Sequence, residues 1–552
     1  MSLRTLSNDS VHWYMQELTS RVVAQSGIPS DRYHLGKIIL QSLKDAPDFV
    51  LQIDGATGQS ESCGSVLERS VRCAQSLRRL GLKRGDVVML LAPNHLDVTI
   101  PLYAALYLGI AVTAFTPTAT INELQEIFAV TKPNIIFCQN EVASRAQLTL
   151  DNLNLNAHII TFDKSDDFCT FTDFMEQYGD DTPTKDFKCS DFDPEESIAF
   201  MLATSGTTGV PKIVAHSHKY FTIVMPYTWS RCKRFPTPTR LVFVCSPIQW
   251  STAMYNFIRS PILRYTRLQT SVTMTREHAC YLNNTYKPTY TILTPTMMAM
   301  FLVPADDSRD IFDLTCFELI MLCGLYVAQS LIDEVKAVSP KTEVLNIYGL
   351  SELSGLAFLG DNPAPGSCGK PMGCFQYRLM NIDTNQEIYK PNVPGELWIK
   401  GPCPAKGYYN NIEATKETFT KDGWLKTGDI FYRDEQWNFF YMDRIKLLIK
   451  GHYLAISPLE IEAVIRKHAG VSDVAVTSIT HNKLGDLPVA FVVPRPGAQP
   501  SADEIKNLVR DSLGERKRLQ GGVIFINSLP MTASSKVDRR KLKELALVLP
   551  RA

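Results

Sequence analysis

The sequence predicts an α/β protein with a large N-terminal domain of doubly wound parallel sheets and a small, mobile C-terminal α+β domain. Apolar runs of strand length, such as residues 87–91 and 134–138, are followed by amphipathic helical segments, the pattern of parallel βαβ units. At 552 residues the chain is also too long for a single core. We expect the domains to span residues 1–442 and 443–552, with a hinge at Asp443.

An uncharged stretch from residue 98 to residue 122 has the length of a membrane span. Pro101, Gly109 and Pro117 interrupt it. We therefore predict a buried helix over residues 102–108 that ends at Gly109, followed by a strand over residues 110–115. No integral membrane segment is expected.

The C-terminal third changes its pattern. After Gly428 and Asp429 we predict a hairpin with Asp434-Glu435 at its turn. Beyond Asp443 the expected elements are a helix, two strands and a second helix, over residues 458–468, 471–478, 489–493 and 502–513. Such a segment has the size of a small α+β domain with its own core.

The composition favours a small-molecule partner. Lys plus Arg and Asp plus Glu both number 57, so no net field favours nucleic acid or an anionic membrane. The 13 cysteines form no C-x-x-C pair, which is typical of reduced thiols, and the N-terminus has no secretory signal. We expect a cytoplasmic location. The C-terminal Pro550-Arg551-Ala552 is unlike an S-K-L peroxisomal signal.

One loop is suited to holding a polyphosphate. Ile198, Phe200 and Leu202 alternate as in a strand, and the strand leads into hydroxyls, glycines and one cation. The loop consists of Thr204, Ser205, Gly206, Thr207, Thr208, Gly209, Val210, Pro211 and Lys212. Its hydroxyls and backbone N–H groups can bind phosphate oxygens, which indicates ATP. The segment lacks the P-loop spacing, and by itself it could be an ordinary turn.

Further segments follow in a fixed order along the chain. They are Tyr348-Gly349-Leu350-Ser351-Glu352, Gly395 to Ile399, Gly407-Tyr408-Tyr409, Gly423-Trp424 with Thr427-Gly428-Asp429, Asp443 to Lys450, Ser457 to Glu462, and Pro530 to Arg540. Together with the loop they resemble the adenylate-forming superfamily, which includes acyl-CoA synthetases, 4-coumarate–CoA ligases, firefly luciferase and peptide-synthetase adenylation domains. The resemblance spans almost the whole chain.

The resemblance implies a nucleotide site. Tyr348 would stack on adenine, next to Gly349 and Gly324, and Ser351 would contact phosphate together with the loop and Lys212. Asp429 would bind both ribose hydroxyls, which suits a carboxylate that accepts two donors, and Arg444 would touch the ribose. Taken singly, an acid such as Asp429 in a glycine turn is common.

The resemblance also implies a metal site and two catalytic lysines. Glu352 and Thr204 would hold Mg²⁺, which prefers oxygen ligands, although Glu352 in isolation could be a solvated loop acid. Lys536 would bridge the attacking carboxylate and the α-phosphate and stabilise developing charge. Lys450, in the hinge segment, is the second implied catalytic lysine.

Several positions depart from the family pattern. Ile213 follows Lys212 where Gly is usual, Cys323-Gly324-Leu325 replaces a Gly-Gly-Ala turn, and Ser535 replaces the Gly before Lys536. Tyr453 stands where the hinge block normally has Gly, so we expect a bulky ring to hinder the thiol in the second half-reaction. Trp250 stands where many relatives carry a His near the acyl pocket, and plain core packing is its alternative role.

The implied activity is that of an acyl-CoA synthetase acting on a hydrophobic acid, fatty or aromatic, with ATP and coenzyme A. A luciferase-like monooxygenase is the first alternative, which Trp250 and Ile347 disfavour. A peptide-synthetase domain is disfavoured because only residues 537–552 follow Lys536. A non-catalytic nucleotide-binding pseudoenzyme is favoured by the lost glycines and disfavoured by the retained charged residues.

Overall fold

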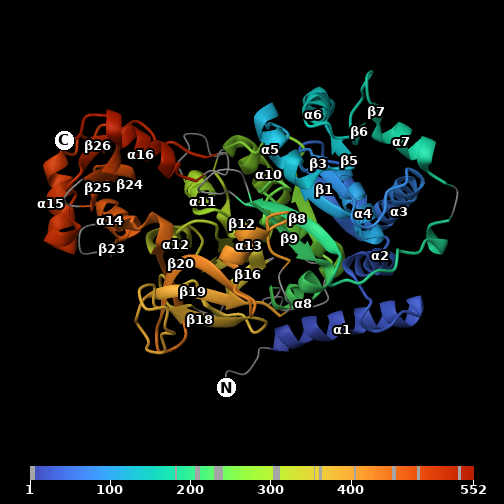
Figure 1. Ribbon diagram of the computed structural model, residues 1–552, viewed down its shortest axis with the longest axis horizontal. Helices are drawn as coiled ribbons and strands as arrows, with labels where there is room; N and C mark the ends of the chain where they lie inside the picture. Colours follow the sequence, from blue (N-terminus) through green and yellow to red (C-terminus); the bar gives the residue numbers. More distant parts are fainter. Residues whose placement is uncertain are drawn as a thin grey trace.

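The computed structural model describes most of the chain (Figure 1). The described residues are 6–180, 183–204, 212–228, 240–302, 311–353, 355–359, 363–402, 406–450, 455–481, 485–532 and 536–552. Two large sheets and their helices form the N-terminal part, and the C-terminal part, red in Figure 1, lies at one end of the molecule.

The first seven-stranded sheet has the order β7-β6-β5-β3-β4-β8-β9 and is parallel except for the β8–β9 pair. Its strands are β3 (Val87–Leu91), β4 (Ala111–Ala114), β5 (Ile135–Cys138), β6 (His158–Thr161), β7 (Cys169–Thr170), β8 (Ile198–Thr204) and β9 (Lys212–Ser217). All five side chains of β3 are buried, and they alternate between two hydrophobic clusters on opposite faces. Helices therefore cover both faces, as expected for a parallel sheet.

Two groups of helices cover this sheet. α5 (Ile121–Thr131) and α6 (Asn140–Asn152) share one cluster with it. The opposite cluster includes α2 (Leu35–Asp45), α3 (Cys63–Arg79), α4 (Thr99–Leu108) and α7 (Phe171–Tyr178). The N-terminal helix α1 (Leu6–Ser26) lies along α2 and α8 (His218–Thr228) (Figure 1).

The uncharged stretch is core, as predicted. Every residue of α4 is buried, Gly109 ends the helix in the left-handed conformation with φ 73°, and β4 follows. The helix begins three residues before the predicted start, within the same buried run. No helix in the described ranges is both long and apolar enough to span a bilayer.

The second seven-stranded sheet has the order β14-β13-β12-β10-β11-β1-β2 and is parallel except for the β1–β2 pair. Its strands are β1 (Val50–Asp54), β2 (Ser60–Ser62), β10 (Leu241–Phe243), β11 (Thr266–Gln269), β12 (Tyr290–Leu293), β13 (Leu319–Leu322) and β14 (Glu343–Asn346). One face packs on α10 (Arg276–Tyr286), α11 (Pro295–Leu302) and α12 (Gln329–Val338). The other face shares the large cluster with α8 and α9 (Ser251–Leu263), which joins the two sheets.

Two smaller antiparallel sheets follow. The sequence analysis predicted only one hairpin of them. They comprise β15 (Tyr348–Leu350), β16 (Gly355–Leu359) and β17 (Lys370–Pro371), and then β18 (Gln376–Met380), β19 (Gly395–Lys400), β20 (Trp424–Arg433) and β21 (Phe439–Arg444), with helix α13 (Ile412–Thr418) between β19 and β20. The β20–β21 pair is the predicted hairpin, with its turn at Asp434. The predicted boundary before Asp443 falls inside β21, and its role as a domain boundary stays a prediction.

The C-terminal part is an α+β unit with its own clusters. After β22 (Ile449–Lys450) and β23 (Ala455–Ile456), the sheet β24-β25-β26 has α14 and α15 in one cluster and α16 in another. The bounds are α14 (Pro458–Ile465), β24 (Val471–His481), β25 (Gly485–Pro494), α15 (Ala502–Leu513), β26 (Gly522–Phe525) and α16 (Arg539–Val548). α15 has the predicted bounds, whereas α14 ends three residues earlier than predicted. Short 3-10 turns complete the structure: η1 (Leu96–Val98), η2 (Thr184–Asp186), η4 (Leu314–Cys316), η5 (Ser351–Leu353), η6 (Ile445–Leu447) and η7 (Glu515–Lys517).

Candidate active site

The structure describes the two ends of the hydroxyl-rich loop. Thr204 ends β8, Lys212 begins β9, and the two residues pair across the antiparallel strands. The Thr204 hydroxyl donates to the carbonyl oxygen of Lys212 at 3.0 Å. Ser205, Gly206, Thr207, Thr208 and Gly209 lie outside the described residues, so their predicted contacts with phosphate stay predictions. Ile213, the first departure from the family pattern, is buried in the core between β9 and the α5–α6 layer.

Tyr408 joins Lys212 to Glu352. Its ring lies 4.9 Å from Nζ of Lys212, and its hydroxyl donates to Oε1 of Glu352 at 2.8 Å. The Tyr408 backbone N–H is bound by Oγ1 of Thr415 at 2.9 Å, and its side chain is buried. Gly407, before it, has φ 75° and leaves no room for a Cβ, which would lie 2.4 Å from Cγ2 of Thr415. The loop before α13 thus holds a phenol between two predicted ATP-handling residues.

The turn that carries Ser351 and Glu352 is fixed by its backbone. It follows β15, where a Cβ on Gly349 would lie 2.5 Å from the carbonyl oxygen of Gly355 on the paired strand β16. His216 on β9 makes a hydrogen bond to the backbone of Ser351. Burial lowers the pKa of His216 to about 3, so this imidazole is neutral at physiological pH. The hydrogen bond from His216 therefore ties this turn to strand β9 of the first sheet.

Asp429 is the centre of a second hydrogen-bonded group. Its buried carboxylate accepts from the Tyr348 hydroxyl at 2.6 Å and from Nε of Arg444 at 2.8 Å. Gly428, with φ 70°, turns β20 so that Asp429 faces Arg444 on β21. Burial raises the pKa of the Asp429 carboxyl and the Arg444 guanidinium opposes that rise, while Asp429 raises the pKa of Arg444. Asp429 is buried and the Arg444 side chain is 43% exposed, so Arg444 supplies the counter-charge of the buried carboxylate from the edge of the site.

Lys536, from the C-terminal part, reaches the same site. Burial and the Arg444 guanidinium lower the pKa of its amine, and the carboxylates of Asp429 and Glu352 act in the opposite direction. Cys323 is also close to Lys536, and burial raises the pKa of its thiol to about 12. Gly324, next to Cys323, has φ 88°, and a Cβ there would lie 3.8 Å from Cγ2 of Thr294, an ordinary van der Waals contact. Lys536 therefore lies near the two predicted acids, Asp429 and Glu352. The catalytic role of Lys536 stays a prediction.

The predicted hinge residue links the two parts of the chain. Asp443, buried near the end of β21, accepts hydrogen bonds from the Ser457 hydroxyl and from the Leu459 backbone N–H, the latter at 3.3 Å. Burial raises the pKa of this carboxyl. Lys450 ends β22, but its side chain is not among those described. Tyr453 and Ser535 lie outside the described residues, so the expectations for them remain open.

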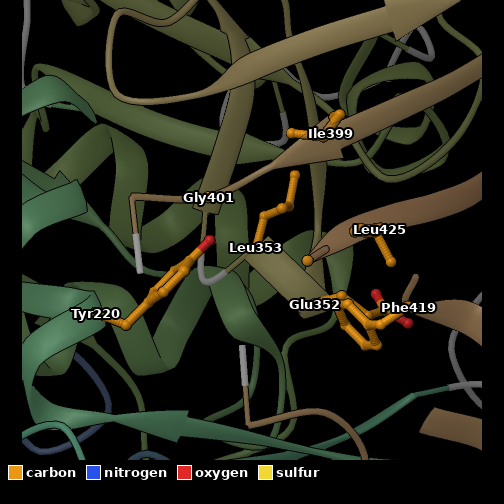
Figure 2. A pocket seen from close by; sticks show the side chains of 8 residues that line it. Tyr220, Glu352, Leu353, Ile399, Gly401, Phe419 and Leu425 are labelled. Carbon is orange, nitrogen blue, oxygen red and sulfur yellow. The ribbon is translucent and has the colours of Figure 1, made fainter. Parts of the chain in front are cut away.

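A small pocket lies beside Glu352 (Figure 2). Tyr220 on α8 and Glu352 are on its wall, and Figure 2 shows the labelled side chains coming from several elements. The remaining lining residues are Leu353, Ile399, Gly401, Phe419, Gly423 and Leu425. Trp250 is half-buried at the N-terminal end of α9 and is not among these residues. Its predicted place in an acyl tunnel stays a prediction.

Two supporting residues had no role in the sequence analysis. Tyr408 was noted only as part of a motif, and His216 was not singled out. The adjacent Gly407, whose backbone needs a positive φ, was the local signal for a constrained loop at Tyr408. Nothing near His216 in the sequence signals its contact with Ser351, because the two residues are far apart in the chain.

The chain matches two family models. The model of the AMP-binding enzyme family covers residues 40–409, and that of the AMP-binding enzyme C-terminal domain covers residues 460–536. These two ranges contain most of the residues that form the site.

Relatives with curated functions include luciferases and CoA ligases. The chain is 32% identical to luciferin 4-monooxygenase of Photuris pensylvanica, over 87% of this chain and 88% of the relative. It is 27% identical to 4-coumarate–CoA ligase-like 3 of Arabidopsis thaliana, over 90% and 89% respectively. A benzoate CoA ligase from Burkholderia xenovorans LB400 has the same fold, with a TM-score of 0.81 and 21% identity over 93% of this chain and 100% of that chain.

Proposed function

Because the chain belongs to the AMP-binding enzyme family, within the adenylate-forming superfamily, we propose that it activates a hydrophobic carboxylic acid with MgATP and transfers the acyl group to coenzyme A. The observation that carries the proposal is the convergence of Glu352, Asp429, Arg444 and Lys536 on one site. A cluster of interacting charged groups of this kind is typical of functional sites, which favours an enzyme over a pseudoenzyme.

The first half-reaction forms an acyl adenylate. An oxygen of the substrate carboxylate attacks the α-phosphorus of ATP, the bond to the β-phosphate breaks, and pyrophosphate leaves with the electron pair. We assign Asp429 and Arg444 to the ribose and Tyr348 to the adenine. The Lys536 ammonium stabilises the charge that develops between the carboxylate and the α-phosphate.

The residues at the phosphate end fit a hard cation. Glu352 offers a carboxylate and Thr204 a hydroxyl, and both are oxygen donors of the kind Mg²⁺ prefers. When bound, Mg²⁺ would neutralise charge on the phosphates. The chain's own part is to hold the Glu352 carboxylate in place through Tyr408 and to supply Lys212 and the residues Ser205, Gly206, Thr207, Thr208, Gly209 and Ser351 to the phosphates.

The second half-reaction transfers the acyl group. The thiol of coenzyme A attacks the carbonyl carbon of the adenylate, and AMP leaves with the bonding electrons. We propose that residues 443–552 rotate against residues 1–442 about Asp443 between the two steps, which presents Lys450 and Tyr453 to the site. Tyr453 adds a ring where a close approach is needed, so we expect thioester formation to be slow relative to adenylation.

The direct test is acid-dependent release of pyrophosphate with MgATP across a panel of carboxylic acids, with and without coenzyme A. Replacing Lys536 by Ala removes one charge-stabilising donor, which typically slows such a step by about 10²–10³. Lys541→Ala, an exposed lysine on α16, is the matched control and should leave the rate unchanged. An unchanged rate in Lys536→Ala would rule out the assignment.

A luciferase-like monooxygenase is the second candidate, because the relative at 32% identity is a luciferin 4-monooxygenase. Incubation with luciferin, MgATP and oxygen distinguishes the two. Light emission would favour the oxygenase, whereas thioester formation with coenzyme A and no light would favour the ligase.

Free thiols at every cysteine of the described ranges support a reducing compartment, and we propose the cytoplasm.

A further inference from the structure

Arg259 on α9 is a buried cation that has no counter-charge among the residues that the structure describes. Only 7% of the residue is exposed. Its Nε and Nη2 atoms are buried and have no hydrogen-bond partner within the described part of the chain. The guanidinium instead lies over two rings, 5.0 Å from the centroid of Tyr255 and 5.5 Å from that of Phe221. Cation–π contacts of this kind do not replace hydrogen bonds, because the donors stay unsatisfied.

The groups around Arg259 cannot neutralise it. The ionisable neighbours that act on it are the phenols of Tyr255, Tyr265 and Tyr290. Burial raises the pKa of Tyr290 to about 12, so this phenol is uncharged. A buried arginine normally has a carboxylate or a full set of acceptors. The guanidinium of Arg259 is therefore suited to bind an anionic or strongly accepting group.

Arg267 on β11 shows what a structural buried arginine looks like in the same molecule. It is fully buried and has no carboxylate partner in the described ranges, but all three of its nitrogen atoms donate to acceptors. The acceptors are Oε1 of Gln269, the Tyr103 hydroxyl, the Phe257 carbonyl, the Ser260 hydroxyl, Oε1 of Gln52 and the Thr99 hydroxyl. The fold thus gives every nitrogen of one buried arginine an acceptor and leaves Nε and Nη2 of Arg259 without one in the described part of the chain.

Arg259 is connected to the candidate site. Tyr255, four residues earlier on the same face of α9, interacts electrostatically with both Arg259 and Glu352. Phe221, which contacts the guanidinium, directly follows Tyr220 on the wall of the pocket beside Glu352 (Figure 2). Tyr255 therefore contacts Arg259 directly and lies within electrostatic range of Glu352.

We propose that Arg259 binds a second anionic group at the far end of the acid substrate, so that the preferred acids have an apolar middle and a terminal carboxylate. The inference rests on the proposed adenylation of an acid. Rings of Phe221 and Tyr255 suit the apolar middle, and the two free N–H groups of Arg259 suit a carboxylate, which arginine binds with paired donors. Arg259 thus acts as a specificity residue at a distance from the reacting carboxyl.

The test compares monocarboxylic and α,ω-dicarboxylic acids of matched, graded chain length in the pyrophosphate assay. In the wild type we expect the best dicarboxylic acid to exceed its monocarboxylic counterpart roughly tenfold or more in kcat/KM, since one charged pair is worth at least that factor. Arg259→Met should reverse this preference, and Arg259→Lys should retain part of it. An unchanged preference in Arg259→Met would overturn the proposal.

Thermal melting of the ligand-free protein separates recognition from folding. Arg259→Met removes a buried charge that has no partner, so its melting temperature should equal or exceed that of the wild type. Arg267→Met removes satisfied hydrogen bonds and should melt lower. If Arg259→Met melts as low as Arg267→Met, Arg259 is structural and the proposal is wrong.

A binding measurement keeps the inference apart from the proposed function. The same dicarboxylic acid, without ATP, should raise the melting temperature of the wild type and not that of Arg259→Met. If this shift occurs while no acid supports pyrophosphate release, the adenylation proposal fails and the anion site stands. If acids support pyrophosphate release without regard to a terminal carboxylate, the adenylation proposal stands and the Arg259 site fails.

Discussion

At the scale of single residues, two tyrosines hold the two acids of the site. Tyr408 donates to Glu352 and Tyr348 donates to Asp429, at 2.8 and 2.6 Å. A phenol that donates to a carboxylate orients it and leaves its charge in place, and such charge-assisted bonds are stronger than neutral ones. Arg444, in contrast, pairs with the charge of Asp429. Glu352 is therefore positioned and still available for a cation.

Replacing Tyr408 by Phe tests this positioning. The ring and its contact with Lys212 remain, whereas the hydrogen bond to Glu352 is lost. Hydrogen bonds to charged groups contribute about 1.5–3 kcal/mol when buried, so we expect roughly a tenfold fall in kcat/KM and a higher apparent KM for Mg²⁺. Titration of pyrophosphate release with Mg²⁺ measures both, and calorimetric binding of MgATP gives a readout independent of turnover.

Tyr409→Phe is the matched control, because Tyr409 contributes its backbone N–H to the Ile213 carbonyl. It should behave as wild type. Equal Mg²⁺ dependence in the wild type and Tyr408→Phe would show that the hydroxyl does not position Glu352.

Trp250 gives a second prediction at the residue scale. It is half-buried at the start of α9, the helix that carries Tyr255 and Arg259. If Trp250 limits the space for the acyl group, Trp250→Ala should shift the preference among acids towards bulkier or longer ones and leave the affinity for ATP unchanged. An equal loss for every acid, with a lower melting temperature, would instead indicate plain core packing.

At the scale of elements, Ser457 connects the hairpin to α14. Its hydroxyl donates to Asp443 on β21, and its oxygen accepts the Glu460 backbone N–H at 3.3 Å as the N-cap of α14. Pro458 occupies the first turn, where its missing N–H does no harm. One side chain therefore caps a helix of the C-terminal part and binds the predicted hinge residue.

Ser457→Ala and Ser501→Ala form a matched pair. Ser501 caps α15 in the same way, with a capping box to Glu504, and no hydrogen bond joins it to Asp443. Each substitution should lower the free energy of unfolding by about 1 kcal/mol. Only Ser457→Ala should also change the ratio of adenylation to thioester formation in single-turnover experiments. If the ratio of adenylation to thioester formation is the same in both variants, the Ser457–Asp443 hydrogen bond has no part in the proposed rotation of residues 443–552.

At the scale of the whole molecule, buried neutral histidines link stability to pH. His34 and His218 are fully buried beside each other, with ring centroids 5.4 Å apart, and His216 lies under the candidate site. Burial lowers the pKa of His34 and of His216 to about 3, and that of His218 well below its usual value. Protonation therefore favours the unfolded chain. Their contribution to stability is complete above a pH of about 6.5 and is lost progressively as the pH falls.

The melting temperature should accordingly fall as the pH is lowered from 7 to 5. Each such histidine removes about 1.4 kcal/mol per pH unit below its unfolded pKa, or about 2 kcal/mol at pH 5. His218→Phe, which keeps an aromatic ring, should flatten the slope, while the exposed His158→Gln should not. A melting temperature that is constant over this range would contradict the assignment of neutral buried imidazoles.

The sequence by itself determined the fold class and the superfamily, while the chemistry it implies for the site stays a prediction. The run over residues 502–513 and the stretch that became α4 and β4 were predicted because their periodicity and their terminating residues are local signals. Membership of the adenylate-forming superfamily was likewise readable, since each motif is a short segment, and the family models bear it out.

Only the tertiary structure decided which side chains meet. The Tyr408–Glu352, Tyr348–Asp429 and His216–Ser351 contacts each join segments far apart in the chain, and no local spacing encodes them. The contrast between Arg267 and Arg259 is of the same kind, because a side chain's hydrogen bonds depend on the elements packed around it. Periodicity reports which face of an element is buried, whereas the partner it is buried against is set by long-range packing.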